Sequence, residues 1–274
     1  NTIFASFLDN GSVSWLYYAD RLMEFPTALL GVALGTVLLP SLSKYHSASD
    51  EGEYSKLLDW GLRLTFIFAA PAAVALALLS VPLVTTLFHY GQFGEHDVWM
   101  TRQALMAYSA GLLGLILVKV LAPGFYARQN IATPVRIAIV TLIATQLMNA
   151  VFVGSLKPGG LEQVTGVGPH TGLALAIGVG ACLNAGLLYR KLREHGIYRP
   201  QPGWGLFALK VVAALAAMAV VLWLAMGPAL WWFGASGMTK ATAVTGLVLL
   251  GGAAYFASLW LLGFRLGDFS RRAA

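Results

Sequence analysis

Seven apolar stretches, each about long enough to cross a lipid bilayer, limit what this chain can fold into. They cover roughly residues 13–39, 57–79, 101–121, 135–153, 171–189, 206–226 and 240–262. A membrane-spanning helix needs about 20 mostly apolar residues, and a helix satisfies its own backbone hydrogen bonds in the hydrocarbon core. Of the 274 residues, 58% are hydrophobic and only 11% are charged, too few charges to cover the surface of a soluble domain. We therefore predict an all-α integral membrane protein, a polytopic helical bundle, and the sequence has no alternating strand pattern of a β-barrel.

Basic residues are distributed unevenly over the segments between these stretches. If the segments alternate between the two sides of the membrane, one side receives most of them, namely Lys44, Lys56, Arg128, Arg136, Arg190, Lys191, Arg193, Arg199 and the tail. The other side receives Arg102, Lys157 and Lys240. Because basic loops stay in the cytoplasm, the C-terminus is predicted to be cytoplasmic. The net charge of +6 is explained this way, without a nucleic-acid partner.

The same pattern predicts how the chain is divided. Residues 1–8 are interpreted as the end of a truncated transmembrane helix, so the chain is expected to be the C-terminal part of something longer. Residues 13–189 are expected to form a bundle, followed by a basic cytoplasmic connector (190–205). Two extra helices (206–263) and a basic cytoplasmic tail (264–274) complete the division. A Gly-rich loop at 157–169 has no predicted role.

A charged cluster in the first apolar stretch is the strongest candidate for a functional site. At about 100° per residue, Tyr17, Asp20, Arg21 and Glu24 fall within one arc of a helix. Each charge costs about 2.5–3.5 kcal/mol at the bilayer centre, so they should face the bundle interior or a water-filled cavity. Asp20 and Glu24 are expected to flank Arg21 and fix its direction, and Pro26 is expected to act as a hinge. The cluster is either a set of structural ion pairs between helices or a site for a substrate or for coupling. The second interpretation is favoured, because charged residues inside a membrane usually have a function.

Other polar positions have structural explanations. Thr145 and Asn149 share a helix face that suits either interhelical hydrogen bonds or a site for a small cation or headgroup. Lys119 can extend to the cytoplasmic interface. Asp59 and Arg63 have the spacing of an interfacial ion pair.

The sequence gives little support for an enzyme. It contains no Gly-Lys-Ser/Thr phosphate loop, no Gly-x-Ser-x-Gly elbow and no His-Glu-x-x-His zinc motif. Glu95, His96 and Asp97 are expected in a solvated loop rather than at a metal, and His170 is expected in a loop without a partner. The single Cys182 excludes an internal disulfide. We predict no catalytic residues, no metal and no cofactor.

Several long motifs carry a resemblance to a known family. They are SWLYYADRLMEFP at 14–26, GVALGTVLLP at 31–40, LFHYGQF at 87–93, KVLAPGFYARQ at 119–129 and TPV at 133–135. In this order they resemble the MurJ (MviN) family of lipid II flippases, within the multidrug/oligosaccharidyl-lipid/polysaccharide exporter superfamily. The resemblance covers essentially the whole chain.

The resemblance implies a fold and a function. Family members have fourteen helices, which are two six-helix lobes around a central cavity and two extra helices. This chain would supply the end of helix seven and helices eight to fourteen, with the second-lobe bundle (helices eight to twelve) at residues 13–189. The family moves lipid II, the undecaprenyl-pyrophosphate-linked peptidoglycan precursor, from the cytoplasmic to the periplasmic leaflet of the bacterial inner membrane by alternating access. Arg21 would line the substrate cavity, and the last two helices would border a groove for the polyprenyl tail.

The implied partners are lipid II, membrane lipids and the missing N-terminal half. Three alternatives stay open. They are an exporter of another polyprenyl-linked glycan, a non-transporting scaffold of cell-wall assembly, and a membrane enzyme acting on a polyprenyl phosphate.

Overall fold

The computed structural model describes residues 2–6, 8, 11–155 and 168–265, and this part of the chain is helical with no strands. The helices are α1 (Thr2–Ala5), α2 (Ser12–Ser47), α3 (Glu51–Leu78), α4 (Ser80–Phe88), α5 (Glu95–Leu121), α6 (Pro123–Tyr126), α7 (Ala132–Ser155), α9 (Pro169–Glu194), α10 (Trp204–Ala225), α11 (Ala229–Gly234) and α12 (Gly237–Leu261). Seven of the described helices (α2, α3, α5, α7, α9, α10 and α12) are long and apolar enough to cross a membrane. The predicted all-α membrane bundle with seven spans is confirmed.

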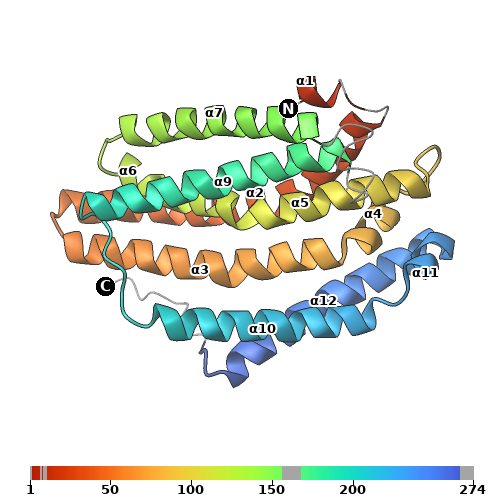
Figure 1. The fold of residues 1–274 in the computed structure, drawn as a ribbon. Helices are drawn as coiled ribbons and strands as arrows, with labels where there is room; N and C mark the ends of the chain where they lie inside the picture. The colour runs from red at the N-terminus through yellow and green to blue at the C-terminus, as the bar shows by residue number, and fades with distance from the viewer. Residues whose placement is uncertain (1, 7, 9–10, 156–167, 266–274) are drawn as a thin grey trace.

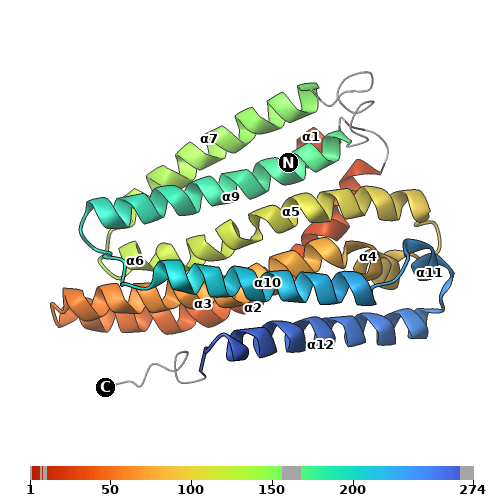
Figure 2. The same cartoon turned by 60° about the horizontal axis from the view of Figure 1, so that its bottom comes forward.

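Helix α5 lies at the centre of the bundle. It packs against α9, α2 and α3, while α7 covers the outer side of α9 (Figures 1 and 2). The burial of the helices agrees with this arrangement. In α5, 61% of the apolar segment is buried inside the protein, but in α7 only 17% of the apolar segment is buried. Much of the surface of α7 is therefore left for lipid.

Small residues allow a close contact between α5 and α9. A Cβ added to Gly111 of α5 would lie 2.0 Å from the Cα of Gly178 of α9, far inside any permitted contact. One turn further on, a Cβ on Gly114 would lie 2.6 Å from the backbone nitrogen of Cys182. Close backbone approach at small residues is how membrane helices gain packing energy, because lipid tails compete for any ordinary apolar contact.

Helices α10 and α12 form a separate pair with its own core. They pack on each other, α10 packs against α3, and α12 against α4 (Figure 2). This second cluster of buried side chains includes Ile67 and Val81 on one side and Val211, Met218 and Tyr255 on the other. The pair is thus attached to the bundle through one side of α3 and α4.

Most helices extend further than the apolar stretches predict. Helix α2 continues to Ser47, and α3 begins at Glu51 rather than near 57, because Asp50 caps it by accepting a hydrogen bond of 2.9 Å from the Glu53 N–H. Helix α9 continues to Glu194, so the basic connector begins as helix. The short helices α4 and α11 lie where loops were expected. Most of the Gly-rich loop and the basic tail lie outside the described residues.

Candidate functional site

The charged cluster lies on the exposed side of α2. The buried residues of this helix include Trp15, Ala19, Met23, Thr27 and Gly31, which recur every three or four positions and face the bundle. The adjoining side of the helix carries the four predicted site residues, and this chain leaves all four exposed. We call this set, Tyr17, Asp20, Arg21 and Glu24, the α2 stripe.

Two neighbours fix the Arg21 side chain. Its Nη1 donates a hydrogen bond of 2.8 Å to Oε2 of Glu24, one turn along the helix. Its Cζ lies 4.9 Å from the centre of the Tyr17 ring, a cation–π distance. The guanidinium is therefore oriented along α2 even though its side chain is 55% exposed.

Asp20 takes a different position from the one expected. The described residues show no ion pair between Asp20 and Arg21, so Glu24 is the carboxylate that pairs with the guanidinium. Asp20 lines a pocket of about 260 Å³ together with Tyr17, Tyr108 and Ile177. Neighbouring residues on a helix point about 100° apart, which explains why Asp20 and Arg21 diverge.

The exposure of these charges limits what can cover them. Arg21 and Glu24 are more than half exposed in this chain, within a helix that is long enough to cross a membrane. Charges in such a helix rarely face lipid, because transfer to hydrocarbon is costly. This side of α2 is therefore expected to face water or another protein surface.

Pro26 lies at the end of the stripe. It has no N–H for the carbonyl of Leu22, which weakens the helix at this turn. The hydroxyl of Thr27 donates to the carbonyls of Met23 (2.6 Å) and Glu24 (3.0 Å), so the same turn is also held by a side chain. Helix α2 continues through the proline, and its first turns (red) run at an angle to the remainder (Figures 1 and 2). The hinge role of Pro26 stays a prediction.

The second predicted polar site faces α9. The Thr145 hydroxyl donates to the Thr141 carbonyl at 2.8 Å, and a Cβ on Gly180 of α9 would lie 2.2 Å from that hydroxyl oxygen. Asn149 is fully buried and donates to Gln146 at 3.2 Å. Both hydrogen bonds join residues of α7, so the interhelical hydrogen bonds expected of this face stay a prediction. An ion site at Thr145 and Asn149 stays a prediction.

A buried carboxylate is the centre of a hydrogen-bond network, of which the sequence predicts only one pair. Asp59 of α3 is 3% exposed, and its Oδ1 accepts hydrogen bonds from the Tyr198 hydroxyl (2.7 Å), the Gln201 N–H (3.0 Å) and the Trp204 indole (2.7 Å). Its Oδ2 accepts from Nε of Arg63 at 2.8 Å. The predicted ion pair of Asp59 and Arg63 is present, and it also anchors the segment that joins α9 to α10.

The surroundings of Asp59 strengthen this anchor. Arg63 donates to the Pro202 carbonyl at 3.0 Å and lies 5.2 Å from the Trp204 ring. Burial, together with the hydrogen bond to Asp59, raises the pKa of Tyr198 above its ordinary value, so its hydroxyl stays protonated and keeps donating. With four donors around one carboxylate, the charge is compensated inside the protein and is not available to a ligand.

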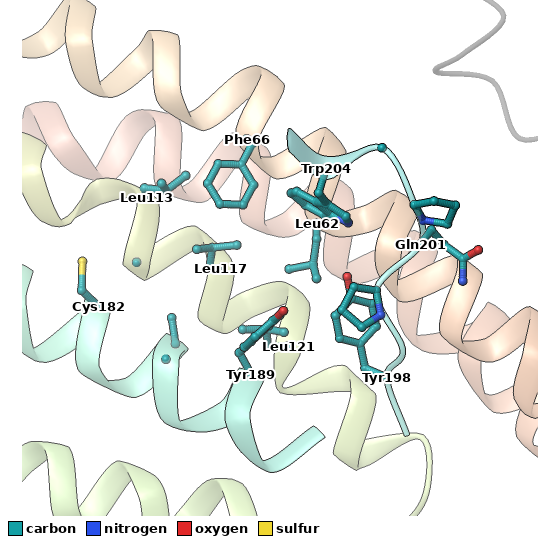
Figure 3. A pocket seen from close by; sticks show the side chains of 16 residues that line it. Leu62, Phe66, Leu113, Leu117, Leu121, Cys182, Tyr189, Tyr198, Gln201 and Trp204 are labelled. Atoms are coloured by element: carbon teal, nitrogen blue, oxygen red, sulfur yellow. The ribbon is translucent and has the colours of Figure 1, made fainter. Parts of the chain in front are cut away.

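An apolar pocket of about 720 Å³ lies beside this anchor, between α3, α5, α9 and the α9–α10 connector. Figure 3 shows Leu113, Leu117 and Leu121 along α5, with Phe66 and Leu62 from α3 nearby. Among the described residues, none that lines this pocket is charged. Its lining suits hydrocarbon, and it offers no counter-charge to a phosphate.

The other polar contacts stabilise the end of the bundle where α2 and α5 begin. Glu95 to Asp97 form the first turn of α5, not a solvated loop, and Asp97 accepts from the Trp15 indole at 2.7 Å and from the Gly94 N–H at 2.8 Å. His170 is buried in the first turn of α9, with Nε2 3.0 Å from the Met100 carbonyl. Both expectations of loop residues were wrong, because the helices begin before their apolar parts.

Comparison with known proteins identifies the family. The sequence model described as "Lipid II flippase MurJ" matches residues 1–242. The chain belongs to the MurJ family. The resemblance predicted from the sequence motifs is confirmed.

Relatives and a solved structure of this family show how much of a MurJ protein is present. Lipid II flippase MurJ of Burkholderia cenocepacia is 52% identical, over 100% of this chain and 51% of the relative. The probable lipid II flippase MurJ of Vibrio cholerae is 38% identical, over 98% of this chain and 49% of the relative. That of Haemophilus influenzae is 36% identical, over 97% of this chain and 51% of the relative. The solved "Lipid II flippase MurJ, inward closed conformation" has a TM-score of 0.64 at 24% identity, over 94% of this chain and 50% of that one, and so shares the fold. The chain spans about half the length of the curated MurJ relatives that it matches.

Proposed function

We propose that this chain forms the second lobe of a lipid II flippase and that its α2 stripe binds the diphosphate of the lipid-linked substrate. The observation that carries the proposal is the arginine of a membrane helix, held by Glu24 and Tyr17 on a side of α2 that this chain leaves uncovered. Relatives over the whole chain are named as lipid II flippases, which supports transport rather than catalysis.

The chemistry of Arg21 suits this substrate. A guanidinium binds phosphate oxygens through two parallel hydrogen bonds and keeps its charge at any physiological pH. Glu24 accepts a hydrogen bond of 2.8 Å from one N–H group of Arg21, and a guanidinium has five, which leaves others for the substrate. Away from bulk water these charge-assisted bonds are stronger, so one oriented arginine can contribute substantially to binding.

The remaining steps follow from the helical arrangement. Bending of α2 at Pro26 would move the stripe relative to the other lobe and expose it to one side of the membrane at a time. The distribution of positive charge over the connector and the tail supports a cytoplasmic C-terminus. Helices α10 and α12 would border the path of the polyprenyl tail, and the first lobe would complete the cavity.

Replacing Arg21 in the complete two-lobed protein tests this proposal. We expect Arg21→Ala to abolish support of growth at normal membrane levels, and Arg21→Lys to restore part of it, because lysine keeps the charge but not the two-pronged geometry. Arg136→Ala is the matched control, since Arg136 is also an exposed arginine of a spanning helix but lies on α7. Normal growth with Arg21→Ala would refute the role of Arg21.

A further inference from the structure

Lys119 of α5 contacts α2 at Thr27 and Gly31, and we call this contact position its seat. Its ammonium donates a hydrogen bond of 3.0 Å to the main-chain carbonyl of Thr27. Its stem crosses Gly31, where an added Cβ would lie 2.1 Å from the Lys119 Cδ and 2.9 Å from its Nζ. The absence of a side chain at Gly31 is therefore what lets the lysine cross the helix at this place.

This seat lies next to the α2 stripe. At about 100° per residue, Thr27 and Gly31 lie within about 60° of Glu24, where the bundle-facing side of the helix meets the stripe. At about 1.5 Å of rise per residue, the Thr27 carbonyl lies about 4.5 Å beyond Glu24 along α2. The Arg21 guanidinium leans towards Glu24 and hence towards Lys119. The two cations are separated along α2 by a distance of the order of one to two helical turns, about 5–10 Å.

The contact differs from that of a lysine that extends to the interface. Such a lysine directs its ammonium to bulk water at the helix end. Here the ammonium is directed to a backbone carbonyl in the middle of α2, and the side chain is still exposed. In the described part of the chain, Lys119 pairs with no carboxylate, so its charge is not neutralised by an ion pair.

We propose that Lys119 is a second phosphate-binding cation, held ready by Thr27 and Gly31, and that it acts together with Arg21 on a lipid diphosphate. The inference rests on the proposed function of the α2 stripe. An ammonium has three N–H donors, and the bond to Thr27 uses one, so two remain for phosphate oxygens. Two cations spaced along α2 favour a diphosphate over a monophosphate, because a diphosphate offers one phosphate group to each cation.

Binding of two lipids by the complete two-lobed protein in detergent tests this inference. The probes are undecaprenyl diphosphate and undecaprenyl monophosphate, and the dissociation constant is measured for each. Lys119→Met keeps an unbranched stem over Gly31 and removes the charge together with the N–H donors of the ammonium. We expect it to weaken diphosphate binding by about tenfold or more, as the loss of a charge-assisted hydrogen bond does, and monophosphate binding much less.

Two glycine variants form a matched pair. Gly31→Ala places a Cβ against the Lys119 stem, so it should weaken diphosphate binding in the same direction as Lys119→Met. Gly35 lies one turn further along α2, and a Cβ added there meets nothing within 4 Å. The Gly35→Ala variant should therefore bind both lipids as the wild type does.

The outcomes separate this inference from the proposed function. If Arg21→Ala weakens diphosphate binding but Lys119→Met does not, the inference about Lys119 is wrong and the α2 stripe stands. If Lys119→Met weakens the binding of both lipids equally and lowers the melting temperature, Lys119 only stabilises the packing of α5 on α2. This result would also overturn the inference. If the wild type binds neither lipid, the proposed function itself fails.

Discussion

At the scale of single residues, Asp59 contributes to the stability of the chain in a way that differs from the charges of α2. It is buried and accepts four hydrogen bonds, three of them from the connector and the start of α10, whereas Arg21 and Glu24 are exposed. The buried charge of Asp59 is compensated by its donors and holds the connector in place, while the oriented and exposed charge of Arg21 can contact a ligand.

Removing the Asp59 carboxylate should therefore destabilise the protein strongly. Asp59→Ala leaves Arg63 without its carboxylate and three other donors without this acceptor, which typically costs about 3–5 kcal/mol. Thermal unfolding in detergent measures the loss. Asp50→Ala is the control on the same helix, because it removes only an exposed N-cap bond worth about 1 kcal/mol. Similar melting temperatures for the two variants would contradict the anchoring role.

These two sites also differ in how far the sequence predicts them. The α2 stripe lies within eight consecutive residues, so helical periodicity alone brings Tyr17, Arg21 and Glu24 together. The partners of Asp59 lie 139 to 145 residues away along the chain, and only its local pair with Arg63 is visible in the sequence. The seat of Lys119 on Gly31 likewise depends on how α5 crosses α2.

At the scale of helices, the crossing of α5 and α9 fixes the centre of the bundle. Gly111→Ala would push a Cβ to 2.0 Å from the Gly178 Cα, a backbone atom that cannot move aside alone. We expect the helices to separate at a cost of about 1–3 kcal/mol, as overpacking usually does. A lower melting temperature in detergent measures this cost.

A second glycine of α9 provides the control for this crossing. A Cβ on Gly186 meets nothing within 4 Å, so Gly186→Ala should melt as the wild type does. Unchanged stability of Gly111→Ala would show that the two helices do not pack at the distance described.

Hydropathy predicts the spans but not the helix ends. The seven apolar stretches correspond to the seven long helices, because apolar length is what a bilayer selects. The ends depend on caps and polar contacts, such as Asp50 at α3 and Asp97 at α5. The short helices α4 and α11 have nine and six residues, too few to be recognised by length.

At the scale of the whole molecule, the bundle is covered unequally on its different sides. The bundle packs its core around α5 but leaves the charged side of α2 uncovered. The chain also spans about half of the MurJ relatives it matches. We therefore expect the other half to supply the surface opposite the α2 stripe.

The most direct test of this account measures lipid II on the outer side of the inner membrane. The complete protein is depleted in cells, and an externally added lipid II-degrading enzyme reports how much lipid II is accessible. We predict that the accessible pool collapses while total lipid II stays constant or rises, and that wild-type protein restores the pool but Arg21→Ala does not. An unchanged accessible pool after depletion would contradict transport of lipid II and would favour another polyprenyl-linked glycan as the substrate.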